Sequence, residues 1–348
     1  MLLCCFVEEW DMVAKKKPGK GQSIREYIAD CPYSNLRNQT IEACRQHNID
    51  LDSPWPPQFP EEQPTPPPAD KSGQLLLFPH WAITRKAAPN AMFRCALFPA
   101  MSANKRKALQ EQKLGSVDGV TTYFSGWQFD QSDLDVYLVL LDLMKDDPFG
   151  TEREIPAYTV LKALGRSTGA NDYKWLHSVF IRLRGGTIDM TDHKTKYFGG
   201  LIDCGLRDEV TKHYKLAINP KFAVLFGYGM WASIDWQQRA GLGRNQTAKA
   251  LHAYYSTHAA PAAHTFDTLA AIVGLTNSNQ RQRNAQLLKA HEALKGTGFL
   301  SDYTATKTSI KVQIKHTPTQ ARHIVQKIAE SKKQSRTKTR DSVDKDTG

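Results

Sequence analysis

The spacing of apolar residues predicts that the folded part of the chain begins near residue 80. A nearly continuous apolar run over residues 132–147 predicts a buried helix that Ser132 caps. Residues 155–165 predict a short second helix, and residues 172–186 predict a third. The third helix has one apolar stripe at i, i+3, i+4 and i+7, made of Leu176, Val179, Phe180 and Leu183.

Strands are predicted on both sides of these helices. Short segments at 92–98 and 120–129 precede the helices and have the composition of strands. A set of strands between residues 187 and 220 follows them and includes a hairpin with a basic tip. Three helices followed by a β-ribbon is the order of elements in a winged-helix domain.

The same order of elements is predicted a second time. Helices are expected over residues 244–258, 265–275 and 276–300, followed by a strand–turn–strand over 300–315. No clear sequence identity relates the two halves, so the repeat is one of architecture. The sequence therefore predicts an α+β fold with two winged-helix domains in tandem, the first over residues 80–232 and the second over residues 233–318.

The flanking segments differ from these two domains in composition. Residues 1–53 form a basic arm followed by a modest helical pattern, and residues 54–79 are a proline-rich linker that contains QLLLF at positions 74–78. The basic, low-complexity tail over residues 319–348 is expected to be disordered. We therefore expect a flexible arm, two folded domains and a flexible tail.

Charge and composition narrow the possible functions. The net charge is +11 and the isoelectric point is near 9.3, which favours a polyanion as the partner. No apolar run approaches the roughly 18 residues that span a bilayer, so we expect a cytoplasmic protein without membrane attachment. The six cysteines form no C-x-x-C pair and no zinc-ligand spacing, so we expect free thiols, no metal and no cofactor.

The helix expected from about Ser278 carries the strongest DNA-binding pattern. In a helix-turn-helix, such a helix enters the major groove, where Asn and Gln suit adenine and Arg suits guanine. Its outward or N-terminal polar residues are Asn279, Arg281, Gln282, Arg283, Gln286 and Lys289, and Lys307 and Lys311 lie on the wing that follows. The alternatives are a solvated helix start and wing lysines that serve only solubility.

The first domain has a weaker version of this pattern. Asn171, Lys174, Ser178 and Arg182 fall opposite the apolar stripe of the third helix, Arg184 follows at its end, and Lys194 and Lys196 lie at the hairpin tip. Lysines suit phosphates better than bases, so these residues are predicted to contact the DNA backbone. A plain basic surface is the alternative.

Enzymatic activity is not predicted. Tyr254 and Tyr255 lie near histidines, as in rolling-circle nickases, but the chain has no upstream His-apolar-His strand motif. Leu251, Tyr254, Tyr255 and His258 instead share one helical stripe, which is typical of core packing. No phosphate loop or cluster of acidic metal ligands is found either, so no catalytic residue is assigned.

A family resemblance extends over about residues 72–315. The chain resembles the TrfA-type replication initiators of broad-host-range plasmids and, more loosely, other tandem winged-helix plasmid initiators. The resemblance rests on an ordered series of segments that includes GWQFDQSDLDVYLVLLDLMKDDPFG, LHSVFIRLRGGTIDM and INPKFAVLFGYGMWASIDWQQRAGLGRNQTAKALHAYYSTH.

This resemblance implies a function. Such initiators bind direct repeats (iterons) in double-stranded origin DNA, help to open an adjacent A·T-rich region, and recruit the host replicative helicase and initiator. A balance between monomer and dimer controls copy number in that family. A winged-helix transcriptional repressor without a replication role is the alternative.

The QLLLF segment has two interpretations. It resembles the pentapeptide that binds the bacterial sliding clamp, with Gln74, Leu75, Leu77 and Phe78 matching and Leu76 departing from the usual small or acidic residue. A flexible linker would then present an extended peptide whose apolar side chains enter a pocket of the clamp. The alternative is the first strand or apolar edge of the folded domain.

Overall fold

The computed structural model describes residues 23–29, 41, 44–45, 50–53, 76–192 and 195–315. The chain divides into two units, Met1–Pro66 and Pro67–Gly348. In the first unit, helix α2 (Ile24–Ala29) is held by an ion pair between Arg25 and Asp52. The predictions for the basic arm, most of the linker and the C-terminal tail lie outside the described residues.

The second unit is a mixed α+β structure with two hydrophobic cores. Helix α5 (Gln131–Met144) runs through the first core and is buried on most of its surface, as its apolar run predicts. The predicted cap was wrong, because Asp130 and not Ser132 accepts hydrogen bonds from the first backbone N–H groups. The Asp130 backbone N–H in turn donates to the Asp133 carboxylate over 3.1 Å, which completes a capping box.

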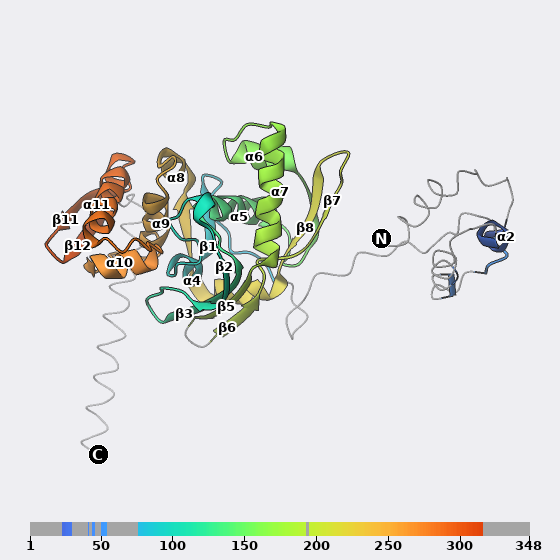
Figure 1. The fold of residues 1–348 in the computed structure, drawn as a ribbon, viewed down its shortest axis with the longest axis horizontal. Helices are drawn as coiled ribbons and strands as arrows, with labels where there is room; N and C mark the ends of the chain where they lie inside the picture. Colours follow the sequence, from blue (N-terminus) through green and yellow to red (C-terminus); the bar gives the residue numbers. More distant parts are fainter. Residues whose placement is uncertain are drawn as a thin grey trace, which may run out of the picture. The chain divides into compact units, whose positions relative to one another are not determined.

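A three-stranded sheet and two helices complete the part of the first core next to α5 (Figure 1). The chain passes from β4 (Arg153–Pro156) through α6 (Ala157–Ala163) and α7 (Ala170–Gly185) to β7 (Ile202–Arg207) and β8 (His213–Ile218). The strand order is β4-β8-β7. The buried residues of α7 are Leu176, Val179, Phe180 and Leu183, which confirms the predicted stripe.

The second core has a similar succession of elements, without the two strands β5 and β6 that follow α7 in the first core. Helix α9 (Gln246–Tyr255) leads to β10 (His264–Thr265), α10 (Phe266–Ile272), α11 (Gln280–Gly296), β11 (Leu300–Ala305) and β12 (Ser309–Ile314). The strand order β10-β12-β11 matches that of the first sheet, because each time the short strand between the first two helices pairs with the last strand. The architectural repeat seen in the sequence is therefore present in the strand order as well.

A second sheet of the first core lies outside this repeat. Strands β2 (Ala108–Lys113), β3 (Val120–Trp127), β5 (Thr187–Asp192) and β6 (Thr195–Gly199) form it in the order β2-β3-β5-β6. The predicted basic-tipped hairpin is β5–β6 and belongs to this sheet. The hairpin in the position of β11–β12 is β7–β8, whose turn contains Asp208 and Glu209, so the expected basic tip is on a different hairpin.

Other elements connect the two cores. Strands β1 (Arg85–Pro89) and β9 (Trp231–Asp235) pair with each other, and α8 (Trp236–Gly241) follows β9. The strand predicted at 92–98 was wrong, because the chain forms the short helix α4 (Asn90–Phe93) and then an irregular buried segment there. Two 3-10 turns, Ala103–Lys105 and Pro220–Gly229, complete the unit.

The two cores are in direct contact. A Cβ on Gly115 would lie 2.3 Å from the carbonyl oxygen of Ala271, so only glycine allows the two backbones to approach this closely. The Ala100 N–H donates to the Val273 carbonyl over 2.7 Å. Arg239, which is 1% exposed, pairs with Asp135 of α5, and Lys249 of α9 pairs with the same carboxylate. Close packing and a buried ion pair therefore both join the cores.

Candidate nucleic-acid interface

The N-terminal end of α11 is fixed by a network of amide side chains. Asn279 is the N-cap residue, and its side chain accepts a hydrogen bond from the Gln282 N–H over 3.1 Å. The Asn277 side chain donates to Oε1 of Gln282 over 3.0 Å. Both contacts are on an exposed turn, so the first residues of α11 are held in place without being covered.

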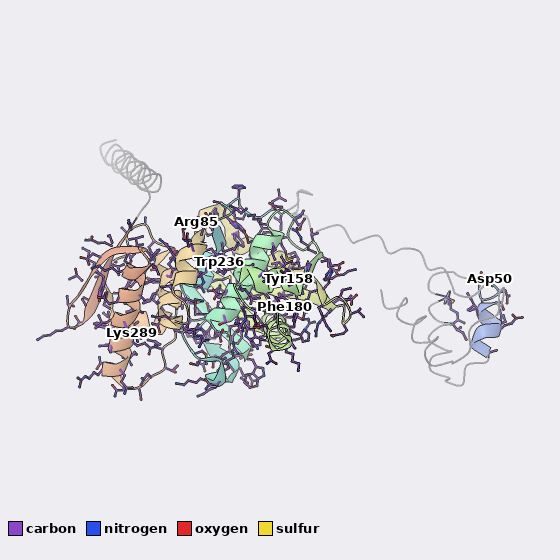
Figure 2. All side chains as sticks on the ribbon, turned by 90° about the horizontal axis from the view of Figure 1, so that it is seen from above. Asp50, Arg85, Tyr158, Phe180, Trp236 and Lys289 are labelled. Carbon is purple, nitrogen blue, oxygen red and sulfur yellow. The ribbon has the colours of Figure 1, made fainter. Side chains whose placement is uncertain are left out.

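The two faces of α11 separate as its periodicity predicts. Leu287, Ala290, His291 and Leu294 are its buried residues. Gln282, Gln286 and Lys289 are exposed, and Figure 2 labels Lys289 on this helix. Gln286 also donates to the Thr247 hydroxyl of α9 over 2.7 Å, so its amide is partly engaged within the protein.

The two arginines near the start of α11 differ in their surroundings. The Arg281 side chain is exposed and has no hydrogen-bond or ion-pair partner among the described residues. The Arg283 guanidinium is only 18% exposed, forms an ion pair with Asp267 of α10, and donates to the Asn277 carbonyl over 3.2 Å. Arg283 thus connects α10, the turn and α11, which leaves Arg281 as the arginine available to a ligand.

The charges of the second core favour a polyanion. Between residues 236 and 315 the chain has ten Lys and Arg residues but only three acidic residues. Each acid has a partner: Asp267 pairs with Arg283, Asp302 pairs with Lys295, and Glu292 accepts a hydrogen bond from Tyr303. Six side chains have no such partner within the described part of the chain: Arg244, Arg281, Lys289, Lys307, Lys311 and Lys315.

The hairpin β11–β12 presents two of these cations. Lys307 is exposed in the turn, where the Thr306 hydroxyl accepts the Ser309 N–H over 3.0 Å and fixes the loop. Lys311 is exposed on β12 opposite Thr304. Arg244, exposed just before α9, is a cation that the sequence reasoning missed. The sequence around Arg244 did not indicate a DNA contact, because a residue just before a helix is typical of a helix cap.

On α7, the predicted residues fall into two groups. Asn171, Lys174 and Arg184 are exposed and have no side-chain partner among the described residues. Arg182 departs from the prediction, because its guanidinium is 13% exposed and donates to the fully buried Asp133 over 2.7 Å. Arg182 therefore stabilises the contact between α7 and α5. Ile181, 58% exposed on the outer face of α7, was not singled out by the sequence pattern.

The described lysine of the β5–β6 hairpin, Lys196, lies on the four-stranded sheet β2-β3-β5-β6. Lys196 is exposed on β6 and forms a 3.0 Å ion pair with Asp189 of β5. Lys194 lies outside the described residues. The prediction that this pair contacts phosphates therefore concerns the second sheet of the first core.

A comparison with protein families decides the classification. A family model described as TrfA protein matches residues 70–311, which is more than half of the chain. This chain belongs to the TrfA family. No curated protein matches it.

Solved structures give only distant similarity. A crystal structure of a complex of the Pi initiator protein with iteron DNA matches with 12% identity and a TM-score of 0.45, over 67% of this chain and 98% of that one. A crystal structure of domains 2 and 3 of RctB matches with 13% identity and a TM-score of 0.42, over 66% of this chain and 99% of that one.

The tyrosine pair of this TrfA-family chain is buried. Tyr254 and Tyr255 are at most 1% exposed, and their hydroxyls hydrogen bond to His264 over 2.9 Å and to His291 over 2.8 Å. Burial raises the pKa of both phenols above the usual value. A phenol that attacks a phosphodiester must be accessible and activated, so these tyrosines have the surroundings expected of core residues.

The described part of the QLLLF segment contacts its own domain. The Phe78 ring stacks on Phe149 with a centroid distance of 3.6 Å, and the Leu76 carbonyl accepts the Phe149 N–H over 2.8 Å. Leu77 points away and is 65% exposed. Gln74 and Leu75 lie outside the described residues. Leu76 and Phe78 thus form an apolar edge of the first core without a strand, and clamp binding stays a prediction.

No group of three or more His, Cys, Asp or Glu side chains among the described residues could hold a metal ion. None of the helices that the structure describes is long and apolar enough to cross a membrane.

Proposed function

We propose that this TrfA-family chain is a plasmid replication initiator that binds direct repeats in double-stranded origin DNA. The observation that carries the proposal is the charge arrangement of the second core, where two of the three acids form ion pairs, the third accepts a hydrogen bond, and six cations have no such partner. A surface of this kind suits a polyanion, and the exposed amides and Arg281 at the start of α11 are side chains that read base edges.

Each core is proposed to be a winged-helix domain. The order helix, strand, helix, helix, strand, strand in the second core supports this assignment. The first core has the same order with β5 and β6 inserted after α7, and its three-stranded sheet has the matching strand order. Helices α11 and α7 would be the recognition helices, and the β11–β12 hairpin would be a wing. The domain boundary predicted near residue 232 is kept within this proposal, as β9 and α8 connect the cores there.

The contacts divide into base reading and phosphate binding. We assign base reading to Asn279, Arg281 and Gln282, and phosphate binding to Lys289, Lys307 and Lys311. On the first core, Asn171, Lys174 and Arg184 are proposed to contact the backbone. Arg182 and Arg283 are assigned to holding the helices in place, because their guanidinium groups are engaged by Asp133 and Asp267.

The remaining parts of the proposal come from the family. They are opening of an adjacent A·T-rich region, recruitment of the host helicase and initiator, and copy-number control through a monomer–dimer balance. Sliding-clamp binding by Leu77 and Phe78 is also proposed, and it would require Phe78 to leave its stacked contact with Phe149.

A replication assay separates an initiator from a repressor. The non-coding DNA beside the gene is joined to a selectable marker on DNA that cannot replicate alone, and the protein is supplied from a second plasmid. An initiator yields stable transformants, and Arg281→Ala lowers their number far more than Lys295→Ala. Lys295 is the matched control, because it lies on the same helix roughly 20 Å away and pairs with Asp302. A repressor yields no transformants and instead silences the adjacent promoter.

A further inference from the structure

The four-stranded sheet β2-β3-β5-β6 has one buried and one open face. Along β3, Val120, Thr122 and Phe124 are buried, whereas the alternate residues Tyr123 and Trp127 are exposed. The same alternation continues on β5 and β6, where Ile188, Met190 and Tyr197 are buried and Phe198 is exposed. The exposed residues therefore share one face of the sheet.

Three aromatic rings stand on the open face. Tyr123 is 40% exposed, Trp127 is 59% exposed and Phe198 is 75% exposed. Asp189 of β5 is the cross-strand partner of Tyr123 on β3 and of Phe198 on β6. Tyr123 and Phe198 therefore lie in one row across the sheet, two strand spacings or about 10 Å apart. Trp127 is four residues along the same strand from Tyr123, or about 13 Å. None of the three has an aromatic or cation–π contact with another described residue.

The groups between and around the rings are polar or basic. Lys113 faces Tyr123 on β2, and Thr121 and Thr191 form the next row with Lys196. The only acid in the Tyr123–Phe198 row, Asp189, is neutralised by Lys196. Glu111, at the β2 bulge, is exposed and has no side-chain partner in the described part of the chain. The strand registers therefore place two lysines on this face, and Lys113 has no acidic partner among the described residues.

The open face is held rigidly from behind. Phe124 packs against Phe129 with a centroid distance of 4.9 Å, and a Cβ on Gly186 would lie 2.6 Å from the Phe129 ring. The sheet is thus in tight contact with the end of α7, which continues directly into β5. A ligand on the open face would meet a preformed surface that needs little ordering.

We propose that the open face of this sheet binds single-stranded nucleic acid by stacking bases on Tyr123, Trp127 and Phe198. Separate aromatic rings on a rigid sheet with lysines between them provide stacking positions for any base and charge for the backbone. A second protein copy fits less well, because interface cores are contiguous and depleted in Lys. The site goes beyond the duplex contacts proposed above, and it would hold a strand exposed when an origin opens.

The test uses the full-length protein and fluorescein-labelled oligothymidine of about 15 nucleotides, a length suited to one such surface. Fluorescence anisotropy measures the dissociation constant at fixed salt. Trp127→Ala and Phe198→Ala are each expected to weaken binding about 5- to 100-fold. Trp127→Phe and Phe198→Tyr keep a stacking ring and are expected to retain affinity within about threefold. In Trp127→Phe, the quenching of protein tryptophan fluorescence by bound oligothymidine should decrease. Ile83→Ala, at an 84% exposed apolar residue outside this sheet, is the matched control and should bind as the wild type does.

Three outcomes would overturn the proposal. In the first, the alanine variants bind oligothymidine as tightly as the wild type. In the second, the wild type does not bind oligothymidine at all. In the third, Phe198→Ala leaves oligothymidine binding unchanged but lowers the sedimentation mass, which assigns the face to a second copy of the chain. Binding of duplex origin DNA, measured in parallel, reports on the proposed initiator function separately and should be unaffected by these variants.

Discussion

The two arginines at the start of α11 allow a sharp test, because they are two residues apart and have opposite surroundings. Arg281→Ala removes an exposed side chain without partners, and Arg283→Ala removes the ion pair with Asp267 and the bond to the Asn277 carbonyl. The first change should therefore affect DNA recognition and leave stability unchanged. The second should lower stability and disturb recognition only indirectly.

The expected magnitudes follow from the geometry. A bidentate arginine–guanine contact contributes about 1–3 kcal/mol of discrimination, so Arg281→Ala should weaken binding to the specific site by about 5- to 100-fold. Asp267 is 69% exposed, so losing its partner leaves no buried charge. Arg283→Ala should then cost about 1 kcal/mol of stability, or roughly 2–4 °C in Tm.

The assay pairs thermal unfolding with anisotropy on specific and random duplexes across a range of salt concentrations. Lys307→Ala is a useful companion, because loss of a phosphate contact should weaken binding to all sequences alike and reduce the salt dependence. The reasoning is refuted if Arg281→Ala weakens random and specific DNA equally. It is also refuted if Arg283→Ala leaves Tm unchanged and abolishes sequence preference.

Three further changes test other parts of the structure. Asp135→Ala should cost about 3–5 kcal/mol in urea unfolding, because it leaves Arg239 buried without its carboxylate; an unchanged midpoint would contradict this. His252→Leu should reduce the loss of Tm as pH falls below about 6.5. Burial, with nearby Arg239 and Arg85, lowers the pKa of His252, so below that pH the unfolded chain takes up a proton that the folded chain excludes; an unaltered pH profile would refute this. Phe78→Ala should lower Tm by several degrees if the Phe149 contact persists in solution, and an unchanged Tm would favour a free peptide.

Periodicity predicted the helices well because their burial is set by local spacing. The stripe from Leu176 to Leu183 is buried as expected. The N-cap of α10 is Thr265, the first residue of the helix predicted over 265–275, and its hydroxyl accepts the Thr268 N–H. The first turn of α5 shows the limit of such reasoning. Asp130 and Ser132 are both good caps, and only the backbone path decides which side chain reaches the free N–H groups.

Pairing between distant strands could not be predicted in the same way. Which hairpin joins which sheet depends on register and on contacts far apart in sequence, so β5–β6 and β7–β8 looked equivalent along the chain. The open face of Tyr123, Trp127 and Phe198 was missed for this reason, because its rings come together only when β3 and β6 lie on either side of β5. The strand expected at 92–98 became a buried turn of helix because its apolar residues fit either structure.

Charge alone could not separate functional from structural arginines either. Arg182 and Arg283 have the spacing of outward residues, but their partners Asp133 and Asp267 come from other helices. The spacing of residues along one helix does not show which acidic side chains of other helices will contact them. The structure therefore reduces the candidate interface to the cations without internal partners and the exposed amides at the start of α11.

The most direct test of the central claim is a nuclease footprint of the purified protein on the non-coding DNA beside its gene, at physiological salt with excess random competitor. The account predicts a ladder of protected direct repeats next to an A·T-rich segment, which Arg281→Ala erases at protein concentrations where Lys295→Ala still protects. A single protected palindrome over a promoter, or protection that Arg281→Ala leaves intact, would contradict it.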